Sequence, residues 1–123
     1  MIMRKLNMDE LNRVSVEKFN MLPKLPLICV LDNIRSQHNI GSIFRTSDAF
    51  RISELYLCGI TATPPNREIN KSALGATESV KWTYFENTSL AVSYLLADGY
   101  QLLAVEQVEN SILLPDFKPL KGN

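Results

Sequence analysis

Apolar and polar positions fall into alternating blocks that predict strands and helices in turn. A continuous apolar run, Leu27 to Leu31, follows two prolines and predicts a strand over 27–32 that is buried on both faces. Polar residues then form a turn, and Asn39 is predicted to cap a helix that extends to about Phe50. Four residues at helical spacing form its expected buried stripe: Ile40, Ile43, Phe44 and Ser47.

The rest of the chain continues this alternation. Strands are predicted over 54–58, 80–85 and 101–106, and helices over 66–74 and 88–97. Asn87 or Thr88 caps the last helix, and Gly99 ends it. Crossovers of this length predict an α/β fold, an open parallel-sheet, Rossmann-like three-layer domain.

An amphipathic helix is predicted over Met8 to about Met21. The expected organisation is an N-terminal helical extension over 1–24 and one domain over 25–123. This helix either packs over the hydrophobic core of the domain, or it contacts RNA or a second subunit.

The junction after the first strand carries the candidate chemistry. A helix N-terminus at the carboxyl end of a strand attracts anions, and Gly41 would allow a ligand to approach closely. Arg45 lies one turn further on, and its side chain is expected to reach back to the helix N-terminus that Asn39 caps. Taken singly, Asn39 is more often only a cap, Gly41 a packing residue and Arg45 a solvated charge; the joint pattern at one end of the sheet is what favours a site.

These residues resemble a known family. The segments Asn39-Ile40-Gly41, Arg45-Thr46 and Asp48-Ala49-Phe50 look like the first motif of the SpoU/TrmH branch of the SPOUT RNA methyltransferases. The stretch Lys71 to Ala76 is similar to a second segment of that branch. The resemblance implies methyl transfer from S-adenosylmethionine to a ribose 2′-hydroxyl of tRNA or rRNA by a homodimer with a C-terminal knot. It assigns a catalytic role to Arg45 and substrate binding to Asn39.

The chain also departs from that family. It has neither the expected Gly-x-Glu-x-x-Gly loop nor the Ser-Leu-Asn segment that build the cofactor pocket and the knot. We therefore expect a SPOUT domain truncated before the knot, with its cofactor-binding residues beyond Asn123. This chain would then be an inactive fragment that does not bind S-adenosylmethionine, and its exposed apolar surface would favour association.

Charge alone gives no argument for nucleic acid, because 13 basic residues balance 13 acidic ones over 123 residues. Affinity for RNA would have to come from a local cluster. The candidate RNA contacts, beside Asn39 and Gly41, are Arg35, His38, Arg67 and Lys71, with Arg45 and Arg51 nearby. Glu106, at the end of the strand over 101–106, would lie near the cofactor or be only a strand-end charge.

The cysteines, the histidine and the lengths of the apolar runs bear on the cellular compartment, metal binding and membrane insertion. Cys29 and Cys58 fall inside apolar runs and are expected to be buried free thiols, which favours a cytoplasmic location. A single histidine, His38, and the lack of Cys-x-x-Cys argue against a metal site. No apolar run approaches the roughly 18 residues of a membrane span.

A guanidinium is a poor general base because its pKa lies above about 12. Arg45 is therefore expected to stabilise the developing alkoxide or to clamp a phosphate. Two alternatives to an enzyme remain: a small non-enzymatic α/β module that binds phosphate or RNA, and a structural partner with no ligand. The chain lacks the glycine-rich dinucleotide and NTP-binding motifs.

Overall fold

The computed structural model describes residues 23–105, and three parallel strands form the sheet within them. Strand β1 (Leu25–Asp32) pairs with β2 (Ile52–Cys58), which pairs with β3 (Trp82–Phe85), giving the order β1-β2-β3. The predicted parallel α/β sheet is confirmed. The helix expected over 8–21 and the residue Glu106 lie outside the described part of the chain.

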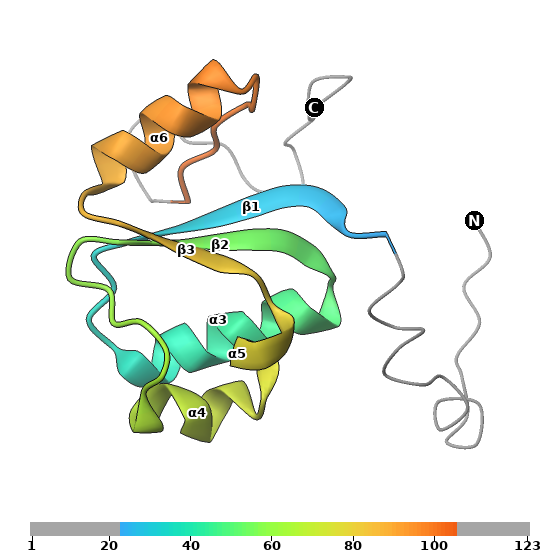
Figure 1. Cartoon of the computed structure of the whole chain (residues 1–123), viewed down its shortest axis with the longest axis vertical. Coiled ribbons are helices and arrows are strands. Elements are labelled where there is room, and N and C mark those ends of the chain that lie inside the picture. The colour runs from blue at the N-terminus through green and yellow to red at the C-terminus, as the bar shows by residue number, and fades with distance from the viewer. Residues whose placement is uncertain (1–22, 106–123) are drawn as a thin grey trace.

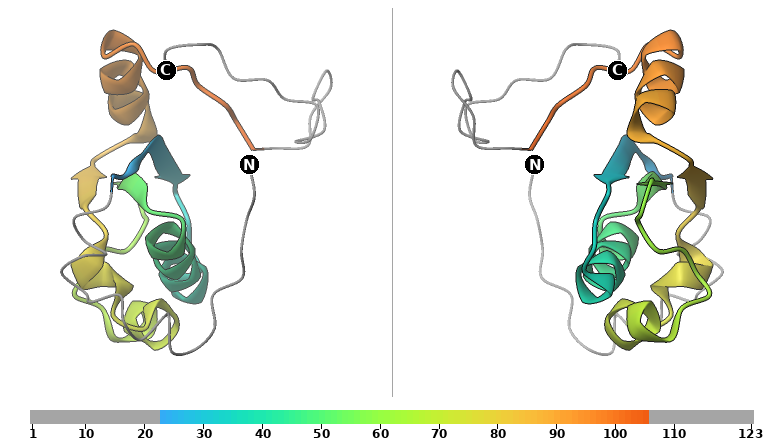
Figure 2. Two further views of the ribbon diagram at one scale, coloured as in Figure 1. Left: turned by 90° about the vertical axis from the view of Figure 1, so that its right-hand side faces the viewer. Right: turned by 90° about the vertical axis from the view of Figure 1, so that its left-hand side faces the viewer.

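Helices cover both faces of this sheet (Figure 1). Helices α3 (Gln37–Ala49), α4 (Arg67–Ala73) and α5 (Ala76–Ser79) lie on one face, and α6 (Thr88–Ala97) lies on the other. The side views in Figure 2 show the sheet between the two layers of helices. This arrangement confirms the three-layer prediction.

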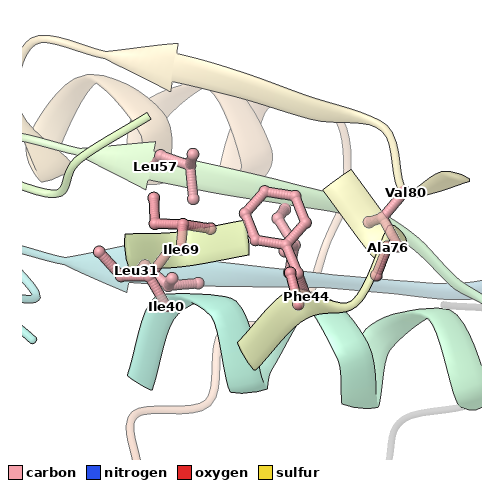
Figure 3. Packing of buried hydrophobic residues seen from close by; sticks show 9 residues of the cluster. Leu31, Ile40, Phe44, Leu57, Ile69, Ala76 and Val80 are labelled. Carbon is pink, nitrogen blue, oxygen red and sulfur yellow. The ribbon is translucent and has the colours of Figure 1, made fainter. Parts of the chain in front are cut away.

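The main core fills the space between the sheet and α3, α4 and α5 (Figure 3). Phe44 and Ile40 of α3 are fully buried there, against Leu57 of β2 and Ile69 of α4. A smaller cluster of Tyr56, Cys58, Ala91 and Leu95 packs α6 on the opposite face. The predicted stripe of α3 is thus largely confirmed, since only Ile43 is half-buried rather than fully buried.

The prediction that the first strand is buried on both faces is wrong for most of its length. Leu31 is buried, but Leu27 is 50% exposed, and Ile28, Cys29 and Val30 are half-buried. The reason is position: among the described residues β1 pairs on one side only, with β2. A strand at a sheet edge leaves one row of backbone groups and part of its side chains open.

The strand expected over 101–106 is absent from residues 101–105, and Val105 is 95% exposed. An apolar run forms a strand only when it pairs with a neighbour, and no described strand pairs with this segment.

Helix boundaries correct the prediction in two places. Helix α3 begins at Gln37, and its cap is Ser36 rather than Asn39; the Ser36 hydroxyl accepts a hydrogen bond from the Asn39 N–H. The predicted helix over 66–74 ends at Ala73, because Leu74 adopts a left-handed conformation, and the short helix α5 follows. The expected limits of α6, Asn87 as cap and Gly99 just past the end, are confirmed.

Candidate functional site

The loops at the carboxyl ends of β1 and β2 are joined by one buried hydroxyl. Thr61 Oγ1 lies 2.8 Å from the Cys58 carbonyl and 3.1 Å from the Leu31 carbonyl, and it accepts a hydrogen bond from the Ile34 N–H at 3.0 Å. Asn33 adds a second tie, because its side-chain oxygen accepts from the Ile60 N–H at 3.0 Å. These bonds fix the loop that leads into α3 and so set where that helix begins.

Helix α4 crosses α3 at Gly41. A Cβ at Gly41 would lie 2.0 Å from Ser72 Oγ and 2.3 Å from the Ile69 carbonyl oxygen. The Ser72 hydroxyl in turn donates to the His38 carbonyl at 2.8 Å. Gly41 is therefore buried under α4, and the prediction that it opens the way for a ligand is wrong: its missing side chain makes room for a helix.

Beside this crossing runs an open groove of about 560 Å³ between α3 and α4. Three basic side chains line it: His38 and Arg45 from α3, and Lys71 from α4. Lys71 also pairs with Glu68 at 3.0 Å, whereas within residues 23–105 the Arg45 guanidinium has no hydrogen-bond or ion-pair partner. No carboxylate is among the described residues that line the groove, so the uncompensated positive charge on its walls is that of Arg45.

The remaining lining residues divide into two kinds. The hydroxyl side chains are Ser42, Thr46 and Ser72, and the apolar side chains are Ala49, Phe50 and Leu74. Residues His38, Ser42, Arg45 and Ala49 follow one another at intervals of four, three and four, which places them along one face of α3. The groove is thus lined by cationic and hydroxyl side chains and also by apolar side chains, two of which, Ala49 and Phe50, lie where α3 ends.

The sequence-predicted site is only partly assembled. His38, Arg45 and Lys71 share the groove, but the exposed side chains of Asn39, Arg35 and Arg67 are not among the residues that line it. Arg45 lies in the groove, and Asn39 does not. The expected convergence of Asn39 with Arg45 at the helix N-terminus is therefore wrong.

Several lining residues were missed by sequence reasoning. Ser42, Thr46 and Phe50 all fall within the predicted helix that extends to about Phe50, so their helical spacing around Arg45 was the signal that could have found them. Leu74 carried no such signal, since its exposure follows from the left-handed turn that ends α4.

Burial shapes the chemistry of the two thiols. Burial raises the pKa of Cys58, which also receives a lowering contribution from a hydrogen bond with Thr88 and a raising one from the Asp32 charge. Burial likewise raises the pKa of Cys29, although this residue is only half-buried rather than fully buried as expected. Both thiols are free and favour the neutral, unreactive form.

Two further findings concern residues 23–105. They contain no group of three or more histidine, cysteine or acidic side chains arranged to hold a metal ion. Among the same residues, no helix has both the length and the hydropathy that a membrane span requires.

Comparison with known proteins gives consistent matches. Residues 26–121 match the model of the SpoU rRNA methylase family. The chain is 27% identical over 88 residues to a putative TrmH family tRNA/rRNA methyltransferase of Staphylococcus saprophyticus, covering 72% of this chain and 35% of that protein. It is 28% identical over 99 residues to a 23S rRNA (guanosine-2′-O-)-methyltransferase, RlmB, of Neisseria meningitidis, covering 77% of this chain and 40% of the other.

An uncharacterized tRNA/rRNA methyltransferase of Synechocystis is 30% identical over 90 residues, which are 69% of this chain and 22% of that protein. The chain thus spans little more than a third of the length of the first two relatives. The family match covers both helices of the groove, the sheet and α6. On this evidence the chain belongs to the SpoU rRNA methylase family.

Proposed function

We propose that the chain is the RNA-holding part of an enzyme that methylates a ribose 2′-hydroxyl of tRNA or rRNA. The observation that carries this proposal is the groove between α3 and α4, where Arg45 is unpaired among the described residues and no acidic side chain is present. An exposed guanidinium offers planar donors that match the oxygens of a phosphate. The names of the relatives support RNA as the molecule that the groove holds.

The groove does not fit S-adenosylmethionine. This cofactor carries a sulfonium cation, and the Arg45 guanidinium on the groove wall has no carboxylate partner among the described residues. The family resemblance assigns the cofactor to Gly-x-Glu-x-x-Gly and Ser-Leu-Asn segments, and neither occurs in this sequence. We therefore expect no binding of S-adenosylmethionine by this chain in calorimetry.

The chain's own contribution is to hold the RNA backbone. Arg45 would fix a phosphate next to the reacting ribose, and Lys71 and His38 would hold neighbouring positions along the groove. Asn39 and Arg67 lie outside the groove and would contact RNA only where it extends toward the carboxyl edge of the sheet.

The test requires a complete enzyme: one polypeptide that continues this chain with a family C-terminal segment carrying the two missing motifs. Methyl transfer to RNA is measured for the parent, Arg45→Ala and Arg45→Lys. We expect Arg45→Ala to lose most turnover and Arg45→Lys to recover only part of it, because lysine keeps the charge but not the fork. Unchanged turnover in Arg45→Ala would remove the proposed role.

A further inference from the structure

We propose that Phe50 is a stacking platform for an unpaired RNA base at the apolar end of the α3–α4 groove. The inference rests on the proposed function and adds to it the kind of RNA that the groove selects. Phe50 is the residue that ends α3, and its side chain is 63% exposed while lining the same groove as Arg45.

The backbone fixes the point from which this ring projects. The Phe50 N–H donates to the Thr46 carbonyl at 3.0 Å, which closes the last turn of α3. Arg51, next in the chain, has a left-handed backbone, and its N–H donates to the Asp48 carbonyl at 3.2 Å. Because the main chain is already fixed at this turn, binding would restrict only the two side-chain torsions of the ring.

The distance between cation and ring suits a nucleotide chain. Phe50 lies five positions after Arg45, which is about 7.5 Å along the helix axis and about 140° around it. Both residues nevertheless line the same groove. The axial interval is of the order of one nucleotide in an extended strand, so a phosphate on Arg45 would leave a neighbouring base near Phe50. Stacking on an aromatic ring needs a base that is not already paired and stacked. The groove should therefore prefer single-stranded RNA to duplex.

The charge of the groove decides between RNA and a second copy of the chain. Two cations and an imidazole line it, and no carboxylate is among its described residues. The whole chain has formal net charge zero, so another copy offers no overall negative charge to match this surface. RNA fits both features of the groove, because its phosphates can pair with the cations and its bases can pack on the apolar side chains.

The test is fluorescence anisotropy with the 123-residue chain, comparing an unstructured RNA with an RNA duplex of the same length. We expect tighter binding of the single strand, and a loss of about 5- to 100-fold for that strand in Phe50→Ala. Phe50→Trp should keep the affinity, and its emission, after subtraction of the Trp82 signal, should be quenched by the single strand. Leu74→Ala is the matched control, because Leu74 is 64% exposed in the same groove but has no ring.

Four results would overturn the proposal: a duplex preference, equal losses on both RNAs, equal losses in Phe50→Ala and Leu74→Ala, or a lower mass of Phe50→Ala in light scattering with unchanged affinity. The last would assign the ring to a contact between copies. If Arg45→Ala weakens binding and Phe50→Ala does not, stacking fails while the proposed function stands. If the parent binds neither RNA, the proposed function fails and stacking fails with it.

Discussion

Single residues decide how closely the two helices of the groove approach. At Gly41 a Cβ would meet the Ile69 carbonyl oxygen at 2.3 Å, and a backbone atom cannot turn aside as a flexible side chain can. We therefore expect Gly41→Ala to lower the free energy of unfolding by about 1–3 kcal/mol through overpacking. Urea unfolding followed by circular dichroism measures this change.

The double variant Gly41→Ala, Ser72→Ala is the control for the cause. It removes the Ser72 hydroxyl, the nearest side-chain atom, but leaves the Ile69 backbone in place. We expect it to remain destabilised relative to Ser72→Ala alone. Full recovery of stability would show that the side chain, and not the helix approach, makes glycine necessary.

The buried thiol of Cys58 gives a prediction about pH. Its folded-state pKa is raised, chiefly by burial, above the ordinary value of 9.0. Below that pH both states hold the proton, so stability is unaffected. As the pH rises further, the unfolded chain loses the proton first, binds fewer protons than the folded chain, and the free energy of unfolding falls. The Cys58→Val variant should lose less stability between pH 8 and 10.5 than the parent; equal losses would contradict this.

Among the helices and strands, the start of α3 shows why the sequence pattern alone could not identify the capping residue. Both Ser36 and Asn39 are good capping residues, and helix periodicity alone does not choose between them. The choice is made by the loop, which Thr61 and Asn33 bind to the end of β2. Those ties connect residues 27 positions apart, so no local pattern contains them.

The correct cap can be tested directly. Ser36→Ala removes the hydroxyl that accepts the Asn39 N–H, and we expect it to cost about 1 kcal/mol in the free energy of unfolding. Asn39→Ala should change stability by less than about 0.5 kcal/mol, since its exposed side chain has no capping role. Chemical denaturation of both variants measures the difference. The reverse order of effects would restore Asn39 as the cap.

Helix α6 exposes several apolar side chains. It is apolar around its whole circumference, and a helix of that kind is usually covered on every side. The inner side packs on Tyr56 and Cys58, but Leu90, Tyr94 and Leu96 are exposed. These three exposed side chains leave apolar surface on α6.

At the scale of the whole molecule, this surface predicts self-association. We expect the chain to form a dimer or larger species in light scattering, and the pair Leu90→Glu, Leu96→Glu to reduce the mass. Ser79→Glu, at an exposed position of α5, is the control and should leave the mass unchanged. A monomeric parent at high concentration would contradict the expectation.

The sequence predicted the order of the elements and the parallel sheet because these follow from apolar blocks and crossover lengths. It did not predict the exposure of β1 or the lack of a strand at 101–105, since both depend on which neighbours pair with a strand. It identified His38, Arg45 and Lys71 separately, but their assembly depends on the close crossing at Gly41. A groove made by helix packing has no signature in the local pattern.

If the groove around Arg45 holds the phosphates of RNA, the salt dependence of RNA binding should report that contact. Binding of single-stranded RNA is measured over a range of salt concentrations for the parent, Arg45→Ala and Lys81→Ala, an exposed cation on the strand side. Losing one phosphate contact should reduce the slope of log K against log salt by about one unit in Arg45→Ala. Lys81→Ala should keep the parent slope. An Arg45→Ala slope and affinity equal to those of the parent would contradict the account.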